Sequence, residues 1–399
     1  MKIKYFNSNF NYINSTGALD NKIIDTIIKL EALNIINDKN LLNHTINIAN
    51  DFSTRKKKIV IFGTGGSNLG ARALNDIILE KNSKIEFYDN IDPIFFSKSL
   101  SQTNFDSTGF LIVSKSGTTP ETLAQFSALY QLAEETNNLD VFLRNILIIT
   151  EFNDSPLYKI AKDKNCLLLE HNPNIGGRYS VFSNVGIVPA IIAGLNITKL
   201  YNGVSEIINN IEKYLNLSLG KYLCNKANTK YNSNILMTYS DYAYFFGKWY
   251  LQLWAESIGK DQNGITPIHS VGTTDQHSQL QLYLDGPRDK FFSFLTTAHS
   301  GKGMRINNDI FNDTDVDYFK NKTMGDLMEA EQKATIETFK INKFSFREIF
   351  IPKIDEENIG KLLAFSMVET ISSCIYLGVN PFNQPAVEQS KKLTKTFLR

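Results

Sequence analysis

The chain has 399 residues, 42% of them hydrophobic and 12% aromatic, so it can bury a large core and form two or three domains. Its 42 lysines and arginines balance 41 acidic residues, which excludes the strong positive field typical of proteins that bind nucleic acid or an anionic membrane. The basic run Arg55–Lys58 has no interleaved aromatic residues and is interpreted as a solvated loop.

The cysteines, the histidines and the N-terminus bear on location and metal binding. Cys166, Cys224 and Cys374 are far apart and odd in number, which fits a reducing compartment better than a disulfide framework. The five histidines show no metal-ligand spacing, so we expect no metal. Residues Met1–Asn7 lack the apolar segment of a signal peptide, and the longest apolar run, Gly186–Leu195, is too short to cross a bilayer. We therefore expect a cytoplasmic protein with no membrane segment.

The first half of the chain is expected to contain one α/β domain. Residues 1–50 have helical patterns and are expected to form an N-terminal helical segment that packs on the second domain. From residue 51 to 199, short apolar strands alternate with helical segments, which predicts a parallel sheet covered by helices on both faces. The expected strands are Ile59–Phe62, Ile85–Tyr88, Phe110–Val113, Ile146–Ile149 and Leu167–Leu169.

A second alternating unit is expected over residues 200–399, although no linker rich in proline and glycine marks the boundary near residue 200. Its expected strands are Ile235–Thr238, Phe291–Leu295 and Ile349–Ile351. An aromatic helix is predicted from about Tyr242 to Ser257, and a last long helix from Glu356 to Tyr376 with Gly378 as its cap. A further C-terminal helix follows. The predicted fold class is α/β, with two domains that each have a parallel sheet flanked by helices.

The segment Ser114–Thr122 (SKSGTTPET) follows an apolar strand and precedes a predicted helix, with Thr119 as a plausible N-cap. It combines several hydroxyl groups, the Lys115 ammonium and backbone N–H groups at the positive end of a helix. Serine, threonine and glycine are also common in ordinary turns. The density of donors here favours a site for a phosphate monoester.

A glycine-rich loop, Gly63–Gly70 (GTGGSNLG), follows the first expected strand. A dinucleotide-binding G-x-G-x-x-G motif would need glycine at position 68, where this chain has Asn68, although Asp89 after the next strand could mimic a ribose-binding acid. The carboxyl ends of parallel strands lie at one edge of a sheet. The two donor-rich loops there favour one compact phosphorylated ligand over a dinucleotide.

Four charged or titratable residues are candidates for chemistry, and each also has an ordinary structural interpretation. Arg178, in Gly176–Ser180 (GGRYS), could stabilise an oxyanion or form a structural ion pair. Glu256 ends an aromatic helix whose apolar surroundings would raise its pKa and suit it to proton transfer. His277 lies near a helix start, and Lys391 lies in the last helix, where a surface role is the ordinary alternative.

Taken together, the blocks GTGGSNLG, SKSGTTPET, GGRYS, SVGTTDQHS and NPFNQPAVEQSKK, in this order, resemble the glucose-6-phosphate isomerase family from about Ile59 to the C-terminus. The resemblance is to the shorter bacterial branch, and it implies two flavodoxin-like sugar-isomerase (SIS) domains and a homodimer with active sites between domains near the subunit interface. The block from His269 to His277 aligns with one that carries a glutamate in longer members, and this chain has Ser270 there. The resemblance to the shorter branch implies that the base lies upstream, in a motif that is here Ala255–Ser257 and contains Glu256.

The resemblance also implies the roles of the site residues. Glu256 would be the base, Arg178 would stand beside the enediol, and His277 or Lys391 would open the sugar ring, with His299 as a reserve. The residues implied to bind substrate are Gly66, Ser67, Ser114, Lys115, Ser116, Thr119 and Gln384.

The implied function is the reversible conversion of glucose 6-phosphate to fructose 6-phosphate through a cis-enediol, in glycolysis and gluconeogenesis. No cofactor is implied, because the reaction conserves oxidation state. The expected partners are a phosphorylated hexose and a second copy of the chain, but neither nucleic acid nor membrane. Two alternatives remain, an isomerase that also accepts mannose 6-phosphate and a non-catalytic sugar-phosphate-binding SIS protein.

Overall fold

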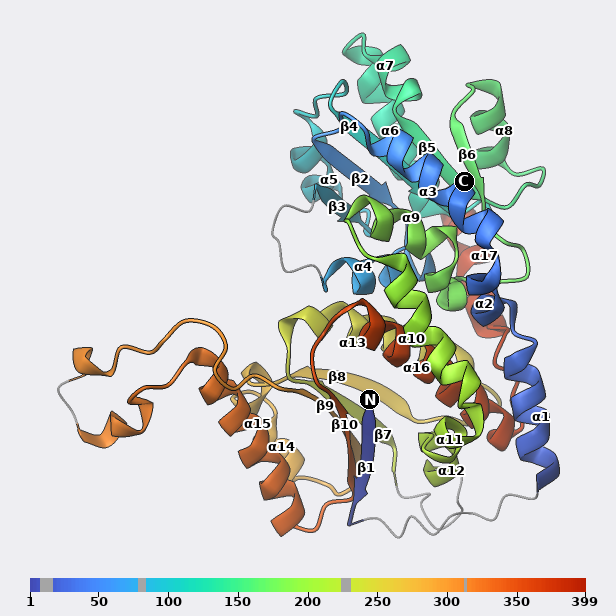
Figure 1. Ribbon diagram of the computed structural model, residues 1–399. Helices are drawn as coiled ribbons and strands as arrows, with labels where there is room; N and C mark the ends of the chain where they lie inside the picture. Colours follow the sequence, from blue (N-terminus) through green and yellow to red (C-terminus); the bar gives the residue numbers. More distant parts are fainter. Residues whose placement is uncertain (8–16, 78–83, 224–230, 312–313) are drawn as a thin grey trace.

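The computed structural model describes residues 1–7, 17–77, 84–223, 231–311 and 314–399. They form two α/β halves, one above the other in Figure 1, each built around a five-stranded sheet. The predicted fold class is therefore confirmed. Cys224 lies outside the described residues, while Cys166 and Cys374 are buried free thiols.

The sheet of the first half is parallel throughout, with the strand order β3-β2-β4-β5-β6. This is the flavodoxin-like order, in which the direction of winding changes between β2 and β4. The strands are β2 (Lys58–Phe62), β3 (Ile85–Tyr88), β4 (Thr108–Val113), β5 (Ile146–Thr150) and β6 (Leu167–Glu170).

Helices cover both faces of this sheet because the central strands are apolar on both sides. Along β2, Ile59 and Ile61 pack on one face against α3 and α9, whereas Val60 and Phe62 pack on the other face against the remaining helices. The first face is covered by α3 (Lys39–Ser53) and α9 (Asn184–Ile192), and the second by α5 (Pro93–Leu100), α6 (Pro120–Glu135), α7 (Leu139–Arg144) and α8 (Pro156–Asp163).

The second sheet has the order β1-β10-β9-β7-β8, in which all neighbours are parallel except β1 and β10. Its strands are β7 (Ser233–Thr238), β8 (Thr266–Val271), β9 (Lys290–Thr297), β10 (Phe346–Ile351) and the edge strand β1 (Lys2–Phe6). The faces are covered by α13 (Tyr244–Ile258) and α16 (Glu356–Leu377) on one side, and by α14 (Leu280–Asp285) and α15 (Met324–Ile341) on the other. Strand β8 was not among the expected strands.

The N-terminal segment departs from the prediction of a helical segment that packs on the second domain. Residues Lys2–Phe6 form a strand because polar and apolar side chains alternate along it, and Phe6 stacks on Phe346 of β10. Helix α1 (Gly17–Ile28) does pack against α16, whereas α3 packs against α9 of the first half. The short α2 is Glu31–Asn34.

Helix α16 is the central support of the second half. Of the described helices it alone is long and apolar enough to cross a membrane, but 83% of its most apolar window is buried inside the fold. Helix α10 (Ile197–Asn209) lies so close to it that a Cβ on Gly203 would fall 2.0 Å from the Glu357 carbonyl oxygen. Gly378 ends α16 in the left-handed conformation with φ 73°, as predicted, and the chain turns back there. The small helices α11 (Ile211–Asn216) and α12 (Leu219–Leu223) complete this side.

The two halves meet where α4 (Leu69–Asn75) packs on α13. Arg72 of α4 lies over the ring of Phe245, with its guanidinium carbon 4.1 Å from the ring centroid, and pairs with Asp89 at 2.7 Å. Asp76, at the end of α4, accepts the Phe245 backbone N–H at 3.3 Å. Burial raises the pKa of Asp76 to about 6, despite the opposing effects of that hydrogen bond and of Arg72.

We predict that Asp76→Asn stabilises the protein at neutral pH. Both folded and unfolded carboxyls are protonated below about pH 4. As the pH rises from there through about 6, the folded state loses stability because its buried carboxyl resists ionisation. Asparagine keeps an acceptor without the charge. We expect urea unfolding to show a gain of about 1–2 kcal/mol at neutral pH relative to about pH 4, after discounting for partial exposure. An equal effect at both pH values would contradict this account.

Candidate active site

Two loops follow strands on either side of the point where the winding of the first sheet reverses. The loop of residues 63–68 follows β2, and the loop of residues 114–119 follows β4. In doubly wound sheets, ligands bind outside the carboxyl ends of the strands at this position. The fold therefore brings together the two donor-rich loops identified from the sequence.

The loop of residues 114–119 is ordered by its own hydroxyl groups. The Ser114 and Thr119 oxygens are 2.9 Å apart, and the Ser116 oxygen accepts both the N–H and the hydroxyl of Thr118. Thr119 is the N-cap of α6 by position, but its hydroxyl makes no capping bond. Among the hydrogen bonds of the described residues, none engages the backbone N–H groups of Lys115 and Ser116. These donors are available to an anion.

The Lys115 ammonium contacts residues outside its own loop. It donates to the carbonyl oxygens of Pro173 at 2.8 Å and Ile175 at 3.1 Å, and lies 3.5 Å from the Glu151 carboxylate. In this arrangement Lys115 connects the loop to the segment that leads into Gly176 and Gly177. Its side chain thus fixes one loop against another, and a direct bond to phosphate stays a prediction.

Two glycine pairs, Gly65–Gly66 and Gly176–Gly177, meet at a backbone contact. A Cβ on Gly66 would fall 2.2 Å from the carbonyl carbon of Gly177, a distance that no side chain can tolerate. The Ser180 hydroxyl bonds to the carbonyl oxygens of both residues, at 3.2 Å to Gly66 and 2.7 Å to Gly177. Ser67 follows in the same turn and is half-buried. Gly66 is therefore required so that the loop after β2 can touch the segment that carries Arg178.

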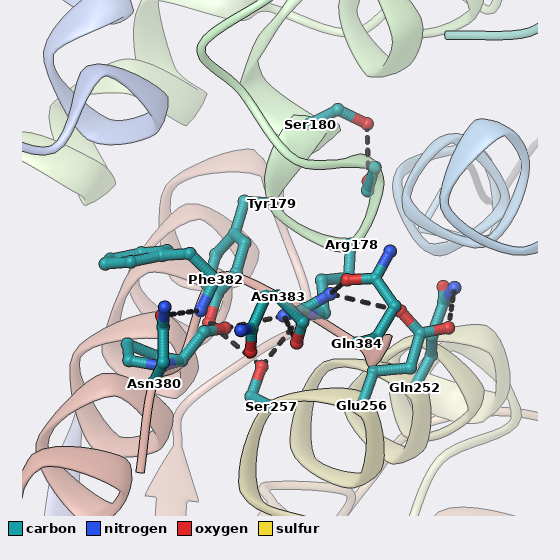
Figure 2. Close-up of polar contacts among 12 residues, drawn as sticks. Arg178, Tyr179, Ser180, Gln252, Glu256, Ser257, Asn380, Phe382, Asn383 and Gln384 are labelled. Atoms are coloured by element: carbon teal, nitrogen blue, oxygen red, sulfur yellow. Dashed lines mark hydrogen bonds and ion pairs between the residues drawn. The ribbon is translucent and has the colours of Figure 1, made fainter. Parts of the chain in front are cut away.

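The buried guanidinium of Arg178 joins three segments of the chain, as Figure 2 shows. Its Nε donates to the Ser257 Oγ at 2.8 Å, and its Nη1 lies 2.7 Å from the Gln384 Oε1 and 3.3 Å from the Glu256 Oε2. Its Nη2 donates to the carbonyl oxygens of residues 381 and 383 at 2.6 and 3.2 Å. Five contacts match the five N–H groups of an arginine, so the protein itself satisfies this side chain.

Glu256 lies on the polar side of α13, away from the aromatic side chains of the same helix. Its Oε1 accepts the Gln252 side-chain N–H at 2.9 Å, and its Oε2 faces Arg178 (Figure 2). The side chain is 34% exposed, whereas Trp249 and Trp254 are buried in the core. The prediction of apolar surroundings for this carboxylate is therefore wrong, because the helix turns its aromatic residues inward and Glu256 toward the loops.

Comparisons with known proteins identify the family of the chain. The model of the phosphoglucose isomerase family matches residues 49–399. The chain belongs to the phosphoglucose isomerase family.

Relatives and a solved structure extend the match along nearly the whole chain. A probable glucose-6-phosphate isomerase of Methanococcus maripaludis is 35% identical over 365 residues, which cover 88% of this chain and 80% of that protein. The glucose-6-phosphate isomerase of Campylobacter jejuni is 32% identical over 390 residues, with 94% and 91% covered. A hypothetical protein of Thermus thermophilus has the same fold, with a TM-score of 0.85 over 100% of both chains at 24% identity.

The family resemblance implied a set of site residues. Of these, the structure brings Gly66, Arg178, Glu256 and Gln384 together. Lys391 and His277 lie outside this group. Lys391 lies on α17 (Glu388–Phe397), where its ammonium pairs with Glu388 at 2.7 Å and both side chains are more than half exposed. The network in Figure 2 does not include it.

The two histidines considered for ring opening lie in the second half. His277 follows a short turn after β8, is exposed, and has no side-chain hydrogen bond to a described residue. The His299 Nε2 bonds to the Tyr239 carbonyl oxygen at 2.7 Å, and its N–H donates to Glu329. These bonds give the reserve candidate a structural role.

The sequence analysis did not assign a role to several residues of this network. Gln252 lies one helical turn before Glu256, and Ser257 directly follows it, so the helical period around Glu256 was the signal that could have found them. The Tyr179 hydroxyl bonds to Ser257 at 2.9 Å, and Lys260 donates to the last carbonyl oxygens of α13. Together they hold the end of α13 under Arg178.

We predict that Gly66→Ala inactivates the protein, since the new Cβ would push the loop away from Gly177 and move Arg178. Gly176→Ala is the matched control, because its Cβ would lie 3.6 Å from the nearest atom, an ordinary contact. We expect the Gly66 variant to lose at least about 100-fold in kcat/KM, as a misplacement of about 1 Å can cause. Comparable steady-state kinetics for the two variants would contradict the assignment of this contact.

Proposed function

We propose that the protein interconverts glucose 6-phosphate and fructose 6-phosphate, and that the network around Arg178 is its catalytic centre. One observation carries the proposal: a buried arginine holds Glu256 and Gln384 next to the glycine loop at the switch point of the sheet. The phosphoglucose isomerase match supports the choice of substrate, since two of the relatives are named glucose-6-phosphate isomerase or probable glucose-6-phosphate isomerase.

The substrate's phosphate would bind in the loop of residues 114–119. The free N–H groups of Lys115 and Ser116 and the hydroxyls of Ser114, Ser116 and Thr119 would donate to it. Gly66 and Ser67 would contact the sugar. Because the phosphate is remote from C1 and C2, the free energy of phosphate binding can position the reacting carbons while the phosphate takes no part in the chemical step.

Glu256 would transfer the proton between C2 and C1. The carboxylate removes the C2 proton, the C–H electron pair forms the C1–C2 double bond, and the C1 oxygen becomes an enediolate. The proton on O2 passes to O1 while the proton held by Glu256 returns to C1, which leaves the C2 carbonyl of the ketose, so no external oxidant or cofactor is needed. Such acid–base catalysis contributes about 10²–10⁴-fold. Arg178 would stabilise the enediolate if Nη1 exchanged its bond to Gln384 for one to the substrate.

Ring opening would need a second proton-transfer group, and His277 and Lys391 remain the candidates. Both side chains are exposed in the single chain.

We propose a homodimer in the cytoplasm. Support for the dimer comes from two apolar side chains that are each 83% exposed, Met304 and Phe397. Met304 lies on an arm after β9 (described residues 298–311 and 314–323), and Phe397 lies on α17. The arm extends away from the body on the left of Figure 1. One chain has a mass of 45.2 kDa, and light scattering of the purified protein should give twice that mass. A monomer at high concentration would refute the dimer.

The first test is the conversion of fructose 6-phosphate by the purified protein in EDTA, coupled to a dehydrogenase specific for glucose 6-phosphate. Turnover above about 1 s⁻¹ would support a metal-independent isomerase. If phosphosugar binds without turnover, a non-catalytic sugar-phosphate-binding protein would be favoured instead.

We predict that Glu256→Gln lowers kcat by about 10²–10⁴-fold while fructose 6-phosphate still binds, because glutamine keeps the shape of the side chain but cannot accept the proton. Glu337→Gln on α15, an exposed carboxylate paired with Lys340, is the control and should retain activity. Substrate binding should be followed by calorimetry. Near-normal turnover of the Glu256 variant would remove this residue from the mechanism.

A further inference from the structure

The loop after β4 has a counterpart in the second half. Strand β9 occupies the same place in the order β8-β7-β9-β10 as β4 does in β3-β2-β4-β5. The third and fourth residues after β4 are Ser116 and Gly117, and those after β9 are Ser300 and Gly301. Both glycines have positive φ, 63° and 75°. The two halves therefore place a serine and a left-handed glycine at corresponding positions, although the hydrogen-bonded turn closes at Gly117 in the first loop and at Lys302 in the second.

The two loops differ in what their donors bind. In the second loop, the N–H groups of His299 and Ser300 donate to the Glu329 Oε2 at 2.9 and 2.8 Å. The Gly301 N–H and the Ser300 hydroxyl donate to the Asp326 Oδ1 at 3.0 and 2.8 Å. Three consecutive N–H groups and a hydroxyl thus surround two carboxylates, whereas the N–H groups of Lys115 and Ser116 in the first loop bind no described residue.

These carboxylates are anions at any working pH. A hydrogen bond from Lys333, followed by those from Ser300 and His299, lowers the pKa of Glu329 to about 2. The Thr323 N–H and then the Ser300 and Gly301 donors hold the pKa of Asp326 far below its ordinary value. The second loop is therefore an occupied anion site in which the anion belongs to the protein.

The surroundings of the second loop also suit a phosphate group. A cavity of about 350 Å³ is lined by Ser300, Asp326 and Glu329 together with Lys322 and Lys333. Ser300 and Gly301 are exposed, so a small anion from solution could reach the loop if the carboxylates were absent. The two lysines supply positive charge on the same wall.

We infer that Asp326 and Glu329 are built-in substitutes for a phosphate group, which close the second loop and leave each chain with one phosphosugar site. Removing the two carboxylates would open a second site of the same chemical class, for phosphate or a phosphate monoester. This inference rests on the proposed function in one respect, the binding of phosphate by the loop of residues 114–119.

The test measures the melting temperature against inorganic phosphate at constant ionic strength, with chloride as the reference anion. The background variant Ser114→Ala/Thr119→Val disables the first loop. We compare this background with the same protein carrying Asp326→Ala/Glu329→Ala. We expect phosphate to raise the melting temperature of the combined variant in a dose-dependent manner and to leave the background unchanged, since a ligand stabilises the state that binds it. Glu337→Ala in the same background is the control for loss of charge on α15.

Four outcomes decide the question. A phosphate-specific rise in the combined variant supports the inference, and so does a variant that folds only in phosphate. A folded combined variant that responds to phosphate no more than to chloride overturns it. If the alanine variant is unfolded in both anions, Asp326→Asn/Glu329→Gln, which keeps side-chain volume, is measured instead, and the same readout decides. Failure of the proposed function is seen separately, as a wild-type protein with an intact first loop that does not respond to phosphate.

Discussion

The arrangement of the candidate site depends on one buried guanidinium. Arg178 reaches out of the segment after β6 and binds the end of α13 and the turn after α16, two regions 78 and 206 residues away in sequence. Charge-assisted bonds of this kind are stronger than neutral ones, and an unpaired buried charge is costly, so each segment has a strong reason to stay in place. The side chain that would serve as a cation in the proposed chemistry thus also connects the two halves at the site.

Contacts within the first half support the bonds of Arg178. The Gly66–Gly177 contact and the Lys115 bonds to residues 173 and 175 fix the two loops of the first half against the segment that carries Arg178. Below Arg178, Ser257 and the Tyr179 hydroxyl fill the space between α13 and the C-terminal turn. The network therefore connects the loop after β4, Arg178 and Glu256 through the covalent chain and short polar contacts.

The sequence predicted the parts of the fold that depend on local pattern. The apolar strands of the first half are continuous hydrophobic runs, and Gly378 stands where a left-handed residue must end α16. Strand β8 was missed because Thr266–Val271 holds a proline and a histidine, and β1 because its alternation covers only five residues. The site was predictable as a set of blocks, but not as a network. That Lys115 would bond to backbone carbonyls, or that Glu256 would lie in polar surroundings, follows from tertiary contacts that no short window of sequence contains.

The backbone contact between the two glycine pairs also has an evolutionary consequence. Where side chains meet, a change on one surface can be absorbed by a rotamer change on the other, but Gly66 and Gly177 meet with no side chain to adjust. The constraint falls on position 66, because a Cβ on Gly177 would lie 3.7 Å from the Gly66 Cα, an ordinary contact. An insertion in either loop would displace the arginine and the glycine turn together. The residue type at position 66 is thus restricted by the backbone of a segment that lies far later in the chain.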